Sequence, residues 1–266
     1  MNFSFLQAAV TGNADIQICG SIKSFFSETV DGIKHFFTEV WDSIVLNLIE
    51  KNRYEYILSG LWITVRIAFF AAIFGALIGI LLAIVKVAAE DNKVFKPFAF
   101  LANIYTTVIR GTPALVQLFI VYYSFCSVFR IDRFYAAIIS FSINSGAYVA
   151  EIVRAGIMSI DKGQIEAGRS LGLSQRTTMI KIVCPQALKN ILPALGNEFI
   201  SLLKETSVAG YIGIVDLSKA GDIIRSQTYS PNVPLYTVAL VYLVIVVFLT
   251  KLLNKFERRL RKSDLR

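Results

Sequence analysis

The sequence holds few of the residues from which catalytic and metal sites are built. It has one histidine, His35, and three cysteines, Cys19, Cys126 and Cys184, whose spacing fits neither a zinc site nor a disulfide framework. The motifs H-E-x-x-H and G-x-S-x-G do not occur. The phosphate-binding motif G-x-x-x-x-G-K-[ST] is also missing. We therefore expect neither enzymatic activity nor a metal or cofactor bound by this chain.

Charged residues are also scarce, at 17% of the chain, whereas 55% of the residues are hydrophobic. Soluble domains usually carry about 25% charged residues. Blocks without any charge run over residues 67–85, 111–129, 134–150 and 232–250, and a fifth apolar stretch, 187–203, holds Glu198. A membrane-spanning helix needs roughly 20 mostly apolar residues. The pattern therefore predicts an all-α, polytopic membrane helix bundle with about five transmembrane helices.

Lysine and arginine gather in two places. The segment 154–189 carries six of them against two acidic residues, and the tail from residue 251 carries seven against two. Because loops rich in Lys and Arg remain on the cytoplasmic side of a membrane, we expect both segments in the cytoplasm. Five spans then place the N-terminus outside. We interpret the basic tail, which ends in residues 259–266, as a topology signal and expect no nucleic-acid partner.

The first 55 residues differ from the rest of the chain. Ile33, Val40, Ile44 and Leu48 belong to a helically spaced apolar set, and charged residues occupy the other face. Such a helix is interrupted by too many charges to span a membrane. We expect it to lie on the outer membrane surface or to pack on the bundle, within an extracytoplasmic extension over residues 1–55.

The most informative stretch runs over residues 163–185. Gly172 is placed to end a short helix in the left-handed conformation, and Ser174 is placed to cap a second helix. Pro185 would end that second helix or kink it before the next apolar stretch. The sequence predicts a polar helix–turn–helix hairpin on the cytoplasmic side, too polar to insert and shaped to dock on a partner.

This hairpin resembles the cytoplasmic EAA loop of the membrane permeases of bacterial ABC importers. The corresponding positions are Glu166, Ala167, Gly168, Gly172, Ile182 and Pro185. Two positions depart from the usual pattern: Gly168 stands for an alanine and Cys184 for a leucine. The stretches 60–64, 110–113, 144–156 and 203–207 are similar to the polar amino acid transport branch of that family. The resemblance covers residues 56–258.

The resemblance implies a type I importer-like transmembrane domain over residues 56–258 in a bacterial cell membrane. It implies two permease subunits, which are identical or related, and two ABC ATPase subunits that bind the ATP. It also implies an extracytoplasmic solute-binding protein. Glu166 would offer a carboxylate to the ATPase, Ala167 and Gly168 would allow close approach, and Gly172 would set the angle of the hairpin.

Polar groups at membrane depth are candidates for the solute pathway. At about 1.5 Å per residue, Asn144 and Glu198 both come near the midplane. They would either face one cavity or hydrogen-bond between helices. Glu151 would line the pathway or pair with Arg154 near the inner interface. Lys204 would form part of a gate or a polar kink.

A secondary transporter or channel is the main alternative, but it would not need the hairpin, and we see no internal repeat of the kind such transporters show. A membrane enzyme would need a catalytic constellation that the sequence does not contain.

Overall fold

The computed structural model describes residues 13–261, and every regular element among them is helical. In chain order the helices are α2 (Asn13–Ile44), the π-helix η1 (Val45–Ile49), the 3-10 helix η2 (Glu50–Asn52), α3 (Tyr54–Asp91), the 3-10 helix η3 (Lys93–Phe95), α4 (Lys96–Arg110), α5 (Ala114–Phe119), the π-helix η4 (Ile120–Cys126), α6 (Arg133–Met158), α7 (Lys162–Ser170), α8 (Gln175–Thr178), the π-helix η5 (Met179–Val183), α9 (Cys184–Glu205), the 3-10 helix η6 (Thr206–Ile212), α10 (Leu217–Thr228) and α11 (Asn232–Arg261).

Three described helices are long and apolar enough to cross a membrane: Tyr54–Glu90, Arg133–Met158 and Asn232–Leu260. A fourth span is obtained if Lys93–Arg110 and Ala114–Cys126 are counted as one broken span, because the chain bends between them by 107°. The all-α membrane bundle is thus confirmed. The break expected at Pro113 is also confirmed, since this proline precedes α5 with extended backbone angles.

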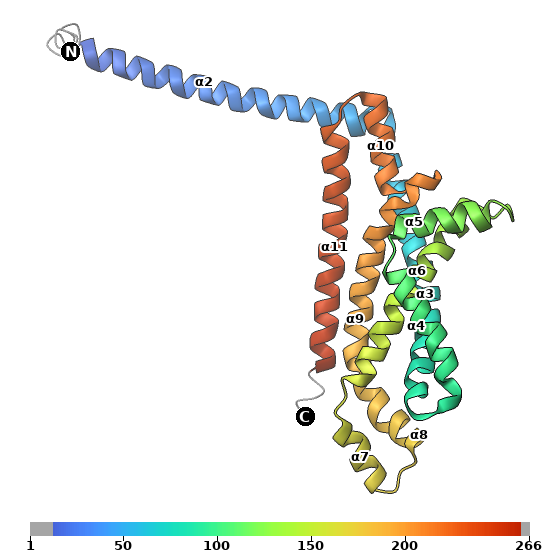
Figure 1. Ribbon diagram of the computed structural model, residues 1–266. Helices are drawn as coiled ribbons and strands as arrows, with labels where there is room; N and C mark the ends of the chain where they lie inside the picture. The colour runs from blue at the N-terminus through green and yellow to red at the C-terminus, as the bar shows by residue number, and fades with distance from the viewer. Residues whose placement is uncertain (1–12, 262–266) are drawn as a thin grey trace, which may run out of the picture.

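The boundaries of two expected spans need correction. The apolar block 111–129 does not form a span by itself. After the bend, its helical part consists only of α5 and η4, which end at Cys126. The stretch 187–203 lies in α9, which is not among the helices that qualify by length and composition. Lys189, Asn190 and Asn197 lower its mean hydropathy, together with Glu198. Figure 1 nevertheless shows α9 running beside α11 within the bundle.

The most extensive helix contact in the described part of the bundle joins α3 to α6, and small residues of α3 lie in it. A Cβ atom added at Gly79 would lie 2.5 Å from the Cβ of Val149, and one added at Gly75 would lie 2.9 Å from the Cβ of Ser145. Only a glycine allows the two backbones to approach this closely. Ala71 and Ala83, which share the stripe, are fully buried. The small-residue stripe therefore acts as a helix contact.

The two ends of the bundle carry different structures. Figure 1 shows α7 and α8 protruding at one end, toward which α11 also runs. At the other end α2 extends sideways, away from the bundle. The expected amphipathic helix thus exists but is longer, and it does not pack along the bundle. Only its continuation, η1, is held there: Asn47 is buried, and the Thr228 hydroxyl donates to its Oδ1 at 2.7 Å.

Candidate functional site: the hairpin and the polar bundle interior

The hairpin between α6 and α9 is built by local capping. Asp161 caps α7 by accepting from the Gly163 backbone N–H at 2.6 Å. Gly172 has φ +81°, and the following N–H of Leu173 donates to the Gly168 carbonyl at 3.1 Å, which closes the helix end. Ser174 then caps α8 by accepting from the Thr177 N–H at 3.2 Å. Both expected caps are confirmed.

Gly168 lies where the first helix of the hairpin packs against the second. It is buried, and a Cβ there would lie 2.9 Å from Thr178 Cγ2 and 3.0 Å from Ile182 Cδ1. The departure from the usual alanine thus lets α7 lie against α8 and η5. In contrast, Glu166 and Ala167 are exposed, and so is Pro185, in the first turn of α9. Glu166 and Ala167 are thus accessible, while Gly168 holds α7 against α8 and η5.

A cavity of about 420 Å³ separates the hairpin from the ends of α3 and α6. Val87, Glu90, Ile157, Met158, Ile160, Lys162, Ile165, Glu166, Gln175, Thr178, Met179 and Val183 line it. The hairpin is therefore not packed solidly on the bundle, which leaves it room to shift as a unit.

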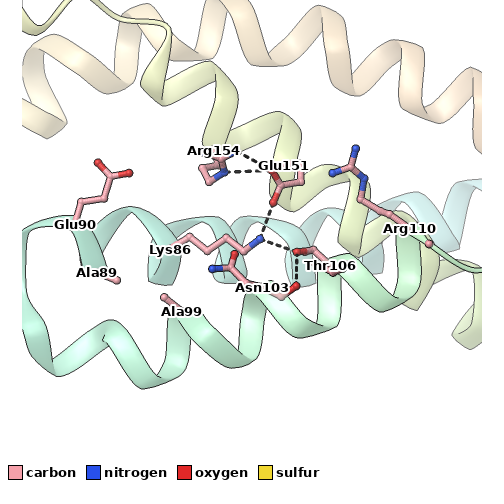
Figure 2. A pocket seen from close by; sticks show the side chains of 11 residues that line it. Lys86, Ala89, Glu90, Ala99, Asn103, Thr106, Arg110, Glu151 and Arg154 are labelled. Carbon is pink, nitrogen blue, oxygen red and sulfur yellow. Dashed lines mark hydrogen bonds and ion pairs between the residues drawn. The ribbon is translucent and has the colours of Figure 1, made fainter.

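A cluster of charges joins three helices near this end of the bundle (Figure 2). Lys86 on α3 is buried, and its Nζ lies 2.6 Å from Glu151 Oε1 on α6 and 2.8 Å from Thr106 Oγ1 on α4. Arg154 Nη2 lies 2.9 Å from Glu151 Oε2. The expected pair of Glu151 and Arg154 is confirmed, but Lys86 was not expected as its second partner.

This cluster borders a cavity of about 700 Å³ between α3, α4 and α6. Its lining includes Lys86, Glu90, Asn103, Arg110, Glu151 and Arg154. Figure 2 shows the Arg110 and Glu90 side chains on either side of the Lys86–Glu151 pair. Arg110 is exposed, and its guanidinium carbon lies 5.4 Å from the centre of the Tyr148 ring. The lining of the cavity thus carries both cationic groups and carboxylates, which a molecule inside the cavity could contact.

A second polar cluster lies at the bend before α5. The Asn144 amide donates to Gln117 Oε1 at 2.9 Å, and the Gln117 amide donates to the Ile109 and Thr112 carbonyls at 2.7 and 3.0 Å. Ile109 lies in the last turn of α4 and Thr112 just after that helix, where the helix ladder stops. Among the described residues nothing donates to the buried Asn144 Oδ1. Gln117 thus connects Asn144 to the broken backbone.

Glu198 belongs to α9 and contacts α6 one residue after Asn144. Its Oε1 accepts from the hydroxyl of Ser145, the next residue of α6, at 3.0 Å. The two predicted midplane groups therefore lie at the same level of α6, Asn144 on that helix and Glu198 bonded to the next residue from α9, and each makes a hydrogen bond to another element. Lys204 is exposed in the last turn of α9, just before η6.

Neither Lys86 nor Gln117 was singled out from the sequence. Lys86 lies at the edge of an apolar block, and Gln117 lies alone inside one. An amide or ammonium group at membrane depth is itself a signal of function. That rule, applied to every polar residue in the uncharged blocks, would have found Gln117.

The bundle, its polar interior and its protruding hairpin together define a membrane permease of a multi-subunit transporter. The model of the family described as "Binding-protein-dependent transport system inner membrane component" matches residues 75–262. The arginine transport system permease protein ArtQ of Bacillus subtilis is 42% identical over 211 residues, which cover 79% of this chain and 94% of ArtQ. A putative glutamine transport system permease protein, GlnP of Rickettsia bellii, is 40% identical over 77% of this chain and 93% of GlnP.

A solved structure described as an amino acid ABC transporter with histidines is 44% identical, with a TM-score of 0.71. The match covers 77% of this chain and 94% of that one. The chain therefore belongs to the family of binding-protein-dependent transport system inner membrane components, the permease subunits of ABC importers. The resemblance carried by the EAA-like hairpin is confirmed, and the chain is a multi-pass membrane protein.

Proposed function

We propose that this chain is the permease subunit of an ATP-driven importer of polar amino acids and that residues 163–185 couple it to a separate ATPase. The observation that carries the proposal is the hairpin, which protrudes from the bundle (Figure 1) and exposes Glu166 and Ala167. Leu171 at its tip is 82% exposed. A protruding tip of this kind is suited to a cleft on another protein. The arginine and glutamine systems among the relatives support amino acids as the solute class.

Coupling depends on the way the hairpin is attached. Glu166 would bind a basic group of the ATPase, while Ala167 and Gly168 would permit close approach. Gly172 would set the angle between α7 and α8, and Ile182 and Pro185 would pass the movement into α9. Because α9 packs against α6 and α11, a shift of the hairpin would move the spans as rigid bodies between inward-open and outward-open states.

The pathway would use the polar interior between α3, α4, α6 and α9. Asn144 and Glu198 would meet the solute near the middle of the bundle, and Glu151 would meet it in the larger cavity. A zwitterionic amino acid needs a cation for its carboxylate and a carboxylate for its ammonium group, and the cavity bordered by Arg110, Glu90 and Glu151 offers both. Lys204 would act near the other end of α9 as part of a gate.

The remaining partners are those that this type of transporter requires. A second permease subunit would complete the pathway, two ATPase subunits would bind the ATP, and a solute-binding protein would deliver the amino acid. The hairpin and the basic C-terminal tail would lie in the cytoplasm by the positive-inside rule. Their common side is supported by the course of α11, which runs toward the hairpin end of the bundle (Figure 1). Residues 1–55 would then lie outside.

The first test is co-purification of the chain with ATPase subunits expressed in the same host. Glu166→Lys reverses the proposed docking charge, and Gly172→Pro removes the left-handed turn. We expect the unmodified chain to retain an ATPase and both variants to lose it while remaining in the membrane. Ser170→Ala, an exposed change on the same hairpin, is the matched control.

Uptake into proteoliposomes separates the alternatives. Uptake of an amino acid that requires the ATPase and ATP supports the proposal. Solute movement by the purified chain alone would instead identify a channel or secondary transporter.

A further inference from the structure

The described part of the N-terminal extension is a long helix, α2, that leaves the bundle where α3 and α11 begin and runs sideways from it (Figure 1). The family match begins only at residue 75. Large apolar side chains of α2, Val30, Ile33, Val40 and Trp41, are exposed. Trp41 has 61% of its surface accessible. A 32-residue helix with this surface needs an environment that covers it.

Apolar residues in the second half of α2 form one stripe. Ile33, Phe37, Val40 and Ile44 lie at intervals of four, three and four residues, which places them on one helix face. Trp41 lies four residues after Phe37 and so borders the same face. Charged side chains lie away from this stripe, with Lys34 close to Asp31 and His35 close to Glu39. Therefore α2 is amphipathic along its described side chains.

The direction of the stripe is fixed by the residues at its C-terminal end. Asn47 comes three residues after Ile44 and is buried against Thr228 of α10. Leu48 packs on the apolar cluster formed by α3, α10 and α11, which contains Ile57 and Val238. The face of the helix that rests on the bundle thus continues outward as the apolar stripe. The stripe faces the side on which the spans lie, rather than away from them.

Aromatic residues mark the level at which α2 departs. Tyr54 and Tyr56 are exposed at the start of α3, and Tyr229 and Tyr236 are exposed just before and within the first turns of α11. Tyrosine and tryptophan collect where the hydrocarbon of a membrane meets the headgroups. The stripe of α2 therefore begins at the membrane–water interface and is continuous with the lipid-facing surface of the spans.

From this placement we propose that α2 is an interfacial helix, bound to the membrane by its apolar stripe, with its charged face turned to water. The ligand is the lipid bilayer at the end of the bundle where α3 and α11 begin. The side chains of Glu28, Asp31, Glu39 and Asp42 outnumber the cations beside them. Burial of apolar surface, not attraction to anionic headgroups, therefore drives the binding.

The chain's two tryptophans, Trp41 and Trp62, make the test direct. In the variant W62F, Trp41 is the sole reporter, and the purified chain is reconstituted into phosphatidylcholine vesicles that contain lipids brominated along their acyl chains. We expect Trp41 emission to be quenched by the brominated lipid and protected from aqueous iodide. High salt should leave the quenching in phosphatidylcholine unchanged, and added phosphatidylglycerol should not strengthen it, because the polar face is acidic.

The matched control moves the reporter to the opposite face. In W41F/W62F/E39W the tryptophan should respond to iodide and not to brominated lipid. Quenching of Trp41 by iodide alone would show a helix free in water and overturn the proposal. Protection of Trp41 from both quenchers would overturn it in favour of a protein neighbour, such as a second copy of this chain. None of these outcomes depends on transport, so the importer assignment stands or falls separately.

Discussion

The Lys86 ammonium on α3 lies 2.6 Å from a Glu151 oxygen on α6 and 2.8 Å from the Thr106 hydroxyl on α4. One cation thus connects three helices next to the larger cavity. Lys86 is almost completely buried, with a side chain that is 4% exposed. A buried charge of this kind is costly without its partner.

The first prediction concerns this ion pair. Lys86→Met leaves Glu151 with Arg154 alone, so we expect a destabilisation of about 2–4 kcal/mol, somewhat below the usual cost of breaking a buried pair. Thermal unfolding in detergent measures it. In the double variant K86M/E151Q no buried charge is left unpaired, because Arg154, which also loses its partner, has a side chain that is 35% exposed, and at least half of the lost stability should return. Additive effects of the two changes would contradict the coupling.

Much of the fold could be predicted from local signals. Gly172 and Ser174 mark the hairpin because helix ends need left-handed glycines and capping hydroxyls, whatever surrounds them. Long uncharged blocks mark spans for an equally local reason. In contrast, the pairing of Lys86 with Glu151 joins residues 65 positions apart. Such a contact depends on how α3 and α6 pack, and the periodicity of apolar residues does not reveal that packing.

The same limit explains the spans that were placed incorrectly. Hydropathy shows that residues 111–129 are apolar but not that the chain bends by 107° before them. The Gln117 amide, which donates to the Ile109 and Thr112 carbonyls, helps hold that bend. A sequence pattern shows the glutamine but not the carbonyls it reaches. The sequence thus predicted which residue types form the candidate site and how deep they lie in the membrane. The contacts between these residues are visible only in the folded structure.

The second prediction separates folding of the hairpin from docking. Gly168→Val drives side-chain atoms into Thr178 and Ile182, so the hairpin should open and both thermal stability and ATPase binding should fall. Ala167→Val adds similar bulk at an exposed neighbour. It should leave unfolding within about 0.5 kcal/mol of the parent and weaken only ATPase binding. Equal stability losses in the two variants would argue against this division.

The third prediction uses the carboxyl group of Asp216, which caps α10. Burial raises the pKa of Asp216 from 3.8 to about 6, against hydrogen bonds from the Lys219 and Ser218 N–H groups that lower it. Protonation is thus easier in the folded chain. The resulting stabilisation is fully present below the unfolded pKa and is lost as the pH rises through about 6.

Asp216→Asn removes the buried charge and keeps one capping oxygen. We expect a net gain of about 1–2 kcal/mol at pH 7.5 and a smaller change of the melting temperature between pH 4 and 7.5 than in the parent. Asp222→Asn is the control, because Asp222 is half exposed on the same helix and pairs with Arg225. Parallel pH profiles of D216N and the parent would show that Asp216 does not cause the pH dependence.

The last prediction tests whether Glu198 touches the solute. Glu198→Gln keeps the size of the side chain and an oxygen that accepts from Ser145, now 3.0 Å away, but removes the charge. If the carboxylate binds a solute ammonium group, uptake at limiting solute should fall about 10–100-fold, since such a bond is worth roughly 1.5–3 kcal/mol. The measurement is ATP-dependent uptake in proteoliposomes that contain the partner subunits.

Ser145→Ala supplies the contrast, because it removes the interhelical bond and leaves the charge. A purely structural Glu198 would leave the half-saturation for solute unchanged in both variants, and only S145A, which loses the interhelical bond, would have a clearly lower melting temperature. A pathway residue would make them differ: E198Q would raise the half-saturation concentration at unchanged melting temperature, whereas S145A would change uptake little. The half-saturation concentration of E198Q divided by that of S145A therefore decides whether Glu198 binds the solute or only holds two helices together.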